Sequence, residues 1–459
     1  MIHAHAAAVK STKSVTEYNI KKQKQNMKML IRKIILSLLT WQARMVLKKY
    51  KPKIIAVTGN VGKTSTKDAI AAVLSPKHHV RSSAKSFNSD FGVPLTILGQ
   101  NTGWGSPLSW LHILFSGFEQ VIFSEDYPKI LVLEVGADRP GDIKKIASWL
   151  RPDITVVTQF QKVPVHVEFF KDREELIREK GYLVEATKKD GLVLYTSDDH
   201  DSHMVSKLAK CMTASYGFES YSSIQVESLD TLYEVYGDFE APVGISARIK
   251  KGDTSIPMRT MGVLGAGTIY AALPALYIGN IFGINIVDCT RSLEMYEKPN
   301  GRMRLIRGIK KTTIIDDTYN ASPKAVEHAL HTLEGLHNDG RKIAVLGDML
   351  ELGTQSQSEH ERIGAVAQKS CHILVTIGRR ARDIAEGALT AGMDENFIYQ
   401  FDKSAEAGVF VETLIENNDI ILVKGSQGIR AENVVLEIMA NPDDAESLLV
   451  RQEGAWSKK

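Results

Sequence analysis

The chain has 459 residues, of which 43% are apolar and 24% are charged, so it is long and apolar enough for a globular protein of two to three domains. Its three cysteines lie far apart and form no CxxC pair, which argues against a disulfide framework or a structural zinc site and favours a reducing cytoplasm. The net charge of +3 hides an asymmetry, because thirteen Lys and Arg against Glu17 alone give residues 1–53 a charge of +12 and leave −9 for the rest.

Residues 1–52 form the basic segment at the start of the chain and are expected to be helical. Their apolar run IILSLLTWQARMVL is interrupted by Gln42 and Arg44, so it is too short and too polar to span a bilayer, and no small-residue cleavage site follows it. Two interpretations stay open. A basic amphipathic helix with Trp41 and leucines on one side would make peripheral contact with an anionic membrane, whereas a helix packed against the body would leave its lysines solvated. Nucleic acid is not expected, because no aromatic residues are interleaved with the basic ones.

Short β-rich runs recur along the rest of the chain, and most are separated by stretches long enough for helices, which predicts parallel sheets with crossover helices. Residues 212–262 instead alternate polar and apolar side chains, which predicts antiparallel hairpins attached to the first sheet. A second α/β unit begins at KPNGRM, so we expect a hinge near Pro299 and Gly301. The β-rich runs are KIIAVTG, KILVLEVG, DITVVTQ, GLVLYTS, TTIIDD, KIAVLGD, HILVTIG and IILVKGS.

The stretch VTGNVGKTSTKDAI at 57–70 follows the first of these runs and opens a predicted helix. It has the pattern of a phosphate-binding P-loop, although Val57 stands where the first glycine of the usual motif would be. Backbone N–H groups of such a loop face a phosphate at the positive end of the helix dipole. Lys63 is expected to neutralise the outer phosphates and the Thr64 hydroxyl to ligate magnesium. The remaining ATP-binding candidates of the loop are Gly59, Asn60, Gly62 and Ser65.

The loop also resembles the T-G-x-x-G-K-[ST]-[ST]-T-K sequence of the Mur ligases, ATP-dependent amide-forming enzymes of peptidoglycan synthesis. The resemblance runs from about residue 53 to about residue 440 and is closest to the type that adds D-alanyl-D-alanine to a UDP-muramoyl tripeptide. It implies an α/β fold with a P-loop-containing central ATPase domain of mostly parallel sheet at 53–297 and a C-terminal Rossmann-like α/β domain at 298–459. The other motifs that carry it are FNSDFGVPLTIL at 87–98, LEVGADRPGDI at 133–143, DDTYNASP at 316–323, and VLGDMLELG with His360.

The resemblance implies that ATP phosphorylates a carboxylate to an acyl phosphate, which an amine then attacks to form an amide. Two magnesium ions would neutralise the approaching anions, and Thr64, Glu134 and His166 match the family's metal-binding positions. Lys180 matches a lysine that carbon dioxide carbamylates, which would let it bind the second ion. Without the resemblance, Glu134 would be a strand-end acid facing solvent, and Lys180 would be a solvated residue on a charged helix.

In the C-terminal domain, Arg302 matches a residue that reaches the phosphate and Asp317 one that reaches the ribose, so this domain is expected to close onto the first. Tyr319 and Asn320 lie on the same turn. The candidates for binding the acceptor and the incoming amine or dipeptide are Asn88, Tyr319, Asn320, Asp348, Glu351 and Lys424. For Asp348, Glu351 and Lys424, a plain strand-end loop is an equally open interpretation.

The chain departs from the family pattern at Ser86, where these ligases have asparagine, and at Gly267 and Thr268, where they have an adenine-binding His-Asn pair. Residues 1–52 are too few for the UDP-binding domain of the muramoyl ligases, so the chain is expected to lack it. The expectation is a cytoplasmic monomer that extends a muramoyl-peptide acceptor. Two alternatives stay open: a ligase with another acceptor, of the folylpolyglutamate synthetase type or acting on lipid-linked precursors, and a non-catalytic P-loop protein.

Overall fold

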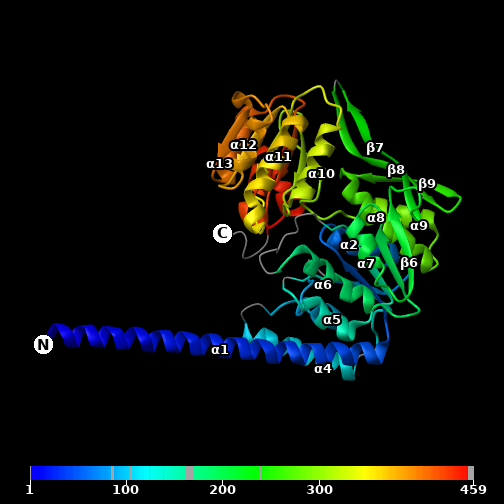
Figure 1. The fold of residues 1–459 in the computed structure, drawn as a ribbon. Coiled ribbons are helices and arrows are strands. Elements are labelled where there is room, and N and C mark those ends of the chain that lie inside the picture. Colours follow the sequence, from blue (N-terminus) through cyan, green and yellow to red (C-terminus); the bar gives the residue numbers. More distant parts are fainter. Residues whose placement is uncertain are drawn as a thin grey trace.

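The computed structural model describes residues 2–83, 87–103, 106–123, 125–137, 139–160, 170–237 and 239–452, without the side chains of residues 2–21, 24, 25 and 28. Its strands form two sheets with helices packed around them (Figure 1). The first sheet has nine strands in the order β2-β3-β1-β4-β5-β6-β7-β8-β9, and the second has six in the order β10-β11-β15-β12-β13-β14. The expected α/β class is confirmed.

The first sheet is parallel from β2 to β7 and antiparallel from β7 to β9. Its strands are β1 (Lys53–Thr58), β2 (Val80–Ser82), β3 (Ile130–Glu134), β4 (Ile154–Val157), β5 (Leu192–Thr196), β6 (Met212–Gly217), β7 (Ile224–Tyr236), β8 (Phe239–Lys251) and β9 (Thr254–Met261). The helices of this part are α1 (Ile2–Tyr50), α2 (Lys63–Leu74), α3 (Gly92–Leu98), α4 (Pro107–Ile122), α5 (Asp142–Leu150), α6 (Arg173–Glu185), α7 (His200–Ser206), α8 (Ala266–Ile281) and α9 (Ile286–Met295).

The second sheet follows, and the predicted domain boundary between residues 297 and 298 lies between α9 and its first strand. Its strands are β10 (Arg304–Arg307), β11 (Thr313–Asp317), β12 (Lys342–Gly347), β13 (Ile373–Ile377), β14 (Ile398–Phe401) and β15 (Ile420–Lys424). Its α-helices are α10 (Pro323–Glu334), α11 (Ser356–Ser370), α12 (Arg382–Thr390), α13 (Ser404–Leu414), α14 (Glu432–Ile438) and α15 (Ala445–Leu448). Short 3-10 turns lie at η2 (Gly353–Gln355), η3 (Glu395–Phe397), η4 (Gln427–Ile429) and η5 (Pro442–Asp444).

The hairpin region was predicted only in part. β7, β8 and β9 form antiparallel ladders, and the alternating burial along β9 explains why its polar and apolar residues alternate. Residues 212–217, placed among the hairpins by the sequence pattern, instead form β6, which pairs in parallel with β5. The antiparallel part therefore begins one strand later than expected.

Strand β1 lies in the parallel part of the first sheet, between β3 and β4, and all of its residues except Lys53 are buried. This explains its nearly unbroken apolar sequence, since a parallel strand covered on both faces has no solvent-facing side. Its register pairs Val57 with Glu134 on one side and Thr58 with Val157 on the other. The loop after β1 and the end of β3 therefore meet at one edge of the sheet.

Helix α1 packs its C-terminal half against α3 and α4, while its N-terminal end extends beyond the body (Figure 1). Leu39, Ala43 and Val46 are fully buried at helical spacing, and the Gln42 amide donates to the Leu114 carbonyl oxygen at 2.7 Å. Part of the basic segment thus packs on the body, as one interpretation held, but Trp41 stays 47% exposed. Within the described part of the chain, no helix combines the length and the apolar character needed to cross a membrane.

His360 on α11 holds the loop that follows β12. Its Nε2 accepts from the Met349 backbone N–H at 2.9 Å, so its Nδ1 carries the proton and donates to the Ser356 carbonyl oxygen at 2.6 Å. The side chain is fully buried, and burial lowers the pKa of His360. The histidine that follows VLGDMLELG in sequence is therefore a structural clamp between a loop and a helix.

We expect His360→Ala to lower the free energy of unfolding by about 1–3 kcal/mol, because it leaves the buried Met349 N–H without an acceptor. Urea unfolding at pH 7.5 measures this, and His331→Ala, at an exposed position on α10, should change little.

The pH dependence gives a second readout of the same residue. Because the pKa of His360 is lowered in the folded chain, the unfolded chain binds the proton more readily, and stability is lost as the pH falls below about 6.5. That loss should be smaller in His360→Ala than in the parent chain, and equal losses would contradict the buried neutral imidazole.

Candidate functional site

The loop predicted to bind phosphate, called the phosphate-binding loop below, joins β1 to α2. Gly59 and Gly62 have φ values of +137° and +81°, which side chains rarely adopt, and a Cβ on Gly59 would lie 2.1 Å from Thr158 Oγ1. The Asn60 and Val61 N–H groups donate to the Gln159 carbonyl oxygen at 3.0 and 3.2 Å, so the segment just after β4 supports the loop. Its sequence therefore needs glycine at these two positions for geometric reasons.

The register of β1 explains the missing first glycine. Val57 is still a fully buried strand residue paired with Glu134, so the chain leaves the sheet only after Thr58. The Lys63 ammonium donates to the Asn60 carbonyl oxygen at 3.1 Å and so folds back over this short loop. Position 57 therefore does not need the backbone freedom of a glycine.

Three side chains from separate elements meet beside the loop. The Thr64 hydroxyl donates to Glu134 Oε2 at 2.8 Å, and the Asn88 amide donates to Glu134 Oε1 at 3.0 Å. Glu134 is only 1% exposed, so it is not a strand-end acid facing solvent. Hydroxyl and carboxylate oxygens are ligands that Mg²⁺ prefers, so this pair fits the predicted metal site. His166, the third predicted ligand, lies outside the described residues.

Lys180 lies on α6 and is 4% exposed, so it is not on a solvated face of that helix. Its neighbour Glu179 accepts backbone N–H bonds at the start of α5, from Gly141 at 2.9 Å and from Ile143 at 2.7 Å. A carboxylate at a helix N-terminus is favoured by the helix dipole. Sequence analysis missed this cap, because Glu179 and α5 are far apart in the sequence.

The ends of β11 and β15 bring Asp317 and Lys424 together in register. The Lys424 ammonium contacts Asp317 Oδ2 at 2.5 Å and donates to the Asn320 carbonyl oxygen at 2.9 Å, and it is 2% exposed. Burial raises the pKa of Asp317, while the positive charge of Lys424 acts in the opposite direction. Asp317 Oδ1 also accepts from the Met303 N–H at 3.2 Å, which ties the segment just before β10 to this edge.

Arg302 lies over the ring of Tyr319, with its guanidinium carbon 4.2 Å from the ring centre. Its Nε is buried and finds no hydrogen-bond partner among the described residues.

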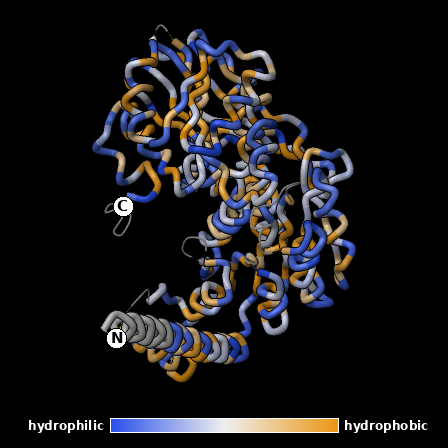
Figure 2. Tube along the Cα trace, turned by 60° about the vertical axis from the view of Figure 1, so that its left-hand side comes forward, coloured by the Kyte–Doolittle hydropathy of each residue, from blue (hydrophilic) through white to orange (hydrophobic). Residues whose placement is uncertain are grey.

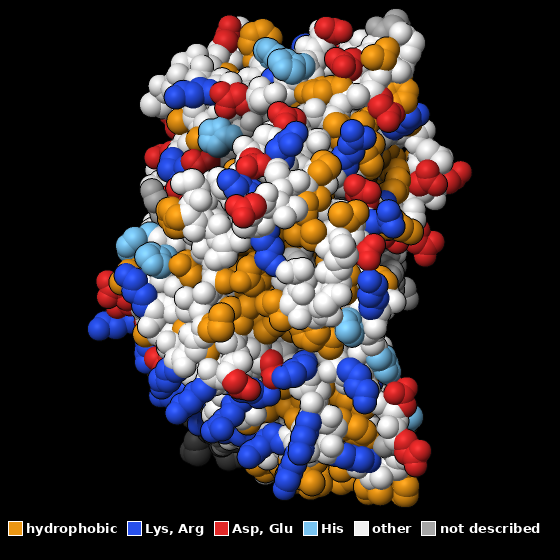
Figure 3. All heavy atoms as spheres, turned by 90° about the vertical axis from the view of Figure 1, so that its right-hand side faces the viewer, with side chains coloured by type: hydrophobic (Ala, Val, Ile, Leu, Met, Phe, Trp, Pro, Cys, Tyr) orange, Lys and Arg blue, Asp and Glu red, His pale blue; other side chains and the backbone are white. Residues whose placement is uncertain are grey.

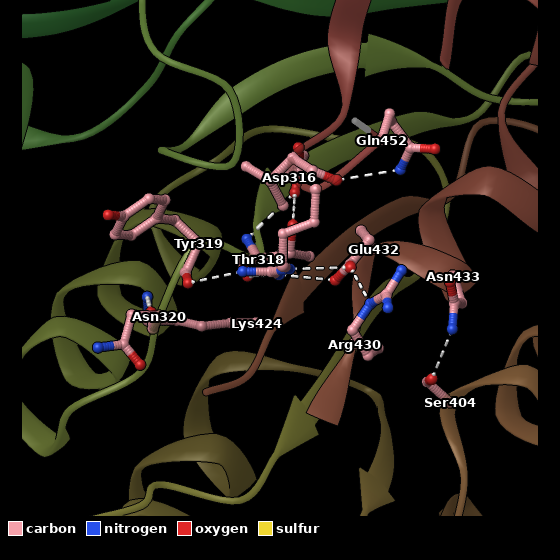
Figure 4. A network of polar contacts seen from close by, with 12 residues as sticks. Asp316, Thr318, Tyr319, Asn320, Ser404, Lys424, Arg430, Glu432, Asn433 and Gln452 are labelled. Carbon is pink, nitrogen blue, oxygen red and sulfur yellow. Dashed lines mark hydrogen bonds and ion pairs between the residues drawn. The ribbon is translucent and has the colours of Figure 1, made fainter. Parts of the chain in front are cut away.

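The turn that carries Thr318 and Tyr319 lies near Glu432 and Arg430 (Figure 4), and Arg451 holds this turn. Arg451 donates to the carbonyl oxygens of Thr318 and Tyr319 at 2.6 and 3.1 Å, and it pairs with the fully buried Glu432 at 2.6 Å. Arg430 donates to the same carboxylate at 2.6 Å. Sequence analysis missed Arg451 and Glu432, because no local pattern marks a contact across 132 residues of chain.

A cavity of about 390 Å³ lies between the two sheets and gathers most of the predicted site. His328 on α10 also lines it, and burial together with the nearby Lys324 lowers the pKa of His328 to about 4, so its imidazole is neutral at pH 7. Gly267 and Thr268 form part of the wall, which is otherwise largely apolar there. The predicted residues on the cavity wall are Asn60, Gly62, Lys63, Thr64, Ser65, Asn88, Glu134, Arg302, Asp317, Tyr319, Asn320 and Lys424.

Asp348 and Glu351 are not among the residues that line this cavity. Asp348 Oδ1 accepts from the Ala381 N–H at 2.8 Å and thereby holds the start of the α12 region. Glu351 is exposed and has a φ of +66°. Their contact with the incoming amine stays a prediction.

Comparisons with known proteins agree with this geometry. The Mur ligase middle domain matches residues 116–273, and the Mur ligase glutamate ligase domain matches residues 301–427. The UDP-N-acetylmuramoyl-tripeptide–D-alanyl-D-alanine ligase of Bacillus subtilis is 28% identical over 403 residues, 87% of this chain and 79% of that protein.

Solved structures share the fold. MurF from Acinetobacter baumannii superposes with a TM-score of 0.72 at 22% identity, over 89% of this chain and 81% of that one. The MurF ligase from Thermotoga maritima in complex with ADP gives a TM-score of 0.70 at 24% identity, over 88% and 83% of the two chains.

We expect Glu432→Gln to lower the free energy of unfolding by about 3–5 kcal/mol, because it leaves the buried charge of Arg451 unpaired. Thermal and urea unfolding measure this. Glu437→Gln, at an exposed position on the same helix, is the matched control and should be close to neutral. Equal stability of both variants would show that the contact of Arg451 with the Tyr319 turn, called the clasp of Arg451 below, does not depend on this carboxylate.

Proposed function

Because the chain belongs to the Mur ligase family and carries its middle and C-terminal domains, we propose that it is an ATP-dependent ligase that joins a carboxylate to an amine through an acyl phosphate. The observation that carries this is the cavity where the phosphate-binding loop and the Thr64–Glu134 pair face Arg302 and Asp317. The names of the relatives support D-alanyl-D-alanine as the amine and a UDP-muramoyl tripeptide as the acceptor.

In the proposed reaction, a carboxylate oxygen of the acceptor attacks the terminal phosphorus of ATP, and ADP leaves. The amine then attacks the carbonyl carbon, and the tetrahedral intermediate expels phosphate while the amine loses a proton. Two anions approach each other in the first step, so cationic groups must surround the transferring phosphoryl group. Lys63 would supply a positive charge on one side, where the N–H groups of Gly62 and Ser65 would add hydrogen-bond donors, and Arg302 would supply a positive charge on the other side.

Magnesium, when bound, neutralises phosphate oxygens and so lowers the repulsion in this step. The Thr64 hydroxyl and the Glu134 carboxylate would hold it, and the Asn88 amide fixes the orientation of Glu134 through the bond to Oε1. Asp317 is held by Lys424 at the opposite wall, where the ribose of ATP would lie. Both walls come from one chain, which supports a monomer as the catalytic unit.

Lys180 is proposed to carry a carbamate, formed when its neutral amine adds to carbon dioxide and releases a proton. The 4% exposure of Lys180 supports this, because it places the amine in a site that is largely shielded from bulk water. The carbamate oxygens would bind a second magnesium ion. The charge of the side chain would thus change from positive to negative.

We expect Lys63→Ala to lower kcat by about 10²–10³-fold, since it removes a charge that stabilises the transition state. Amine-dependent phosphate release from ATP, with UDP-muramoyl tripeptide and D-alanyl-D-alanine, measures this. Lys77→Ala, just beyond α2 and 49% exposed, should retain full activity. Near-normal turnover of Lys63→Ala would overturn the assigned mechanism. If the parent chain is active only with folates or lipid-linked precursors, its acceptor is not a muramoyl peptide of this kind.

We expect Lys180→Ala to lose ligation activity that acetate or propionate partly restores, because a short carboxylate supplies the missing anion. Lys189→Ala, at an exposed position nearby, should need no rescue. A crystal grown with ATP analogue, magnesium and bicarbonate should show density for the carbamate at the tip of Lys180. An unmodified amine in that crystal would contradict the proposal.

A further inference from the structure

Helix α1 carries an apolar stripe that the body does not cover. Its members recur every three or four residues, so they form a line along the helix beside the buried line of Leu39, Ala43 and Val46. Trp41 is 47% exposed and Ile31 51% exposed, which leaves much of their apolar surface in water. The stripe consists of Met27, Ile31, Ile34, Leu38, Trp41 and Met45.

Helix α4 carries a second stripe with the same spacing, in which Leu111 is 63% and Phe115 64% exposed. The rings of Trp41 and Phe118 lie 5.7 Å apart, so the two stripes meet in one surface, which we call the α1–α4 face. The α1 side of their contact is fixed by bonds from Gln42 to the Leu114 carbonyl oxygen and from Tyr50 to that of Gln120. The members of the second stripe are Leu108, Leu111, Phe115, Phe118 and Ile122.

A basic edge borders this face. Lys33, Arg44 and Lys48 are exposed and lie eleven and four residues apart, so they line the flank of the α1 stripe that is turned away from the body. No Asp or Glu occurs between Glu17 and Asp68. Figure 2 shows apolar segments along both helices, and Figure 3 shows Lys and Arg side chains gathered beside hydrophobic ones at this end of the molecule.

We propose that the α1–α4 face binds the surface of an anionic lipid bilayer, with the two apolar stripes entering the headgroup boundary and the basic edge contacting lipid phosphates. A helix with Trp, Phe and Leu on one side and Lys and Arg beside them is suited to this position. Trp41 has the amphipathic ring that favours the membrane interface.

The charge distribution decides against a second copy of this chain as the occupant. Heptad-like spacing of the α1 stripe is also typical of a coiled coil, but such pairs use opposite charges beside the seam. Here every charged side chain among the described residues of α1 that flank the stripe is basic, so two copies would bring like charges together. The surface is also two helices wide, which is wider than a coiled-coil seam needs.

The test uses the full chain and vesicles of phosphatidylcholine, either alone or with one third phosphatidylglycerol, in a flotation assay. We expect binding to the anionic vesicles at 50 mM salt and at least a tenfold weaker partition at 500 mM salt, because the basic edge is screened. Absence of binding to anionic vesicles at low salt would overturn the proposal.

Two sets of variants separate the two parts of the face. Leu111→Ser with Phe115→Ser should weaken the partition at least tenfold, whereas Met212→Ser with Val235→Ser, at exposed positions on the first sheet, should not change it. Lys33→Glu, Arg44→Glu and Lys48→Glu together should also abolish binding, whereas Lys189→Glu, Lys207→Glu and Lys210→Glu, with the same net charge, should retain it. The proposal would be overturned if either set of variants changed vesicle binding no more than its control set does.

Folding and association are measured on the same samples. All four variants should keep the thermal unfolding midpoint and the ATP affinity of the parent chain, because the altered residues are exposed. If Leu111→Ser with Phe115→Ser instead converts a dimer to a monomer in sedimentation, the face is an interface between copies and the proposal is wrong. Ligation activity plays no part in this test, so its outcome is independent of the reaction proposed above.

Discussion

The parallel register between β1 and β3 fixes the position of Glu134 relative to the loop that follows β1. Val57 lies opposite Glu134, so the carboxylate at the end of one strand stands beside the loop at the end of the next. A shift by one residue would turn Glu134 to the other face of the sheet, away from Thr64. The buried apolar residues on both faces of β1 prevent such a shift, so the core of the first sheet sets the geometry of the site.

The second sheet places charged groups where little water reaches, so each buried charge needs a partner of opposite sign. Asp317 and Lys424 neutralise each other at neighbouring strand ends, and Glu432 does the same for Arg451. Buried pairs of this kind are weak evidence for stability, since the cost of desolvation offsets much of their attraction. Their contribution here is geometric: Lys424 and Arg451 bind three successive carbonyl oxygens, those of Thr318, Tyr319 and Asn320. The turn that supports Arg302 is thereby held from both sides.

Much of the fold could be predicted from the sequence, because all eight β-rich runs named from it became strands β1, β3, β4, β5, β11, β12, β13 and β15. The turn between β1 and α2 was also predictable, since a strand, a glycine-rich turn and a helix are adjacent in the chain, whereas Glu134 was singled out only by the resemblance to the Mur ligases. Short strands such as β2 and β14 were missed because three or four residues give no clear period.

Contacts between distant parts of the chain could not be predicted from the sequence. The burial of Lys180 depends on the packing of α6, and the clasp of Arg451 depends on a turn that lies far earlier in the chain. Asp348 shows a limit of local pattern, because a polar residue after a strand is consistent with either a ligand contact or a loop contact, and its carboxylate here accepts the Ala381 backbone N–H. The exposed position of Trp41 was equally unpredictable, since an aromatic residue in an apolar run suits a core as well as a surface.

The clasp of Arg451 also bears on the order in which the site is assembled during synthesis. Ribosomes make the phosphate-binding loop first, and domains fold from the N-terminal side as the chain emerges. The carbonyl oxygens of Thr318 and Tyr319 receive their guanidinium only after translation has passed residue 451. A nascent chain can therefore fold its first sheet while the opposite wall of the cavity still lacks the guanidinium that binds the Thr318 and Tyr319 carbonyl oxygens.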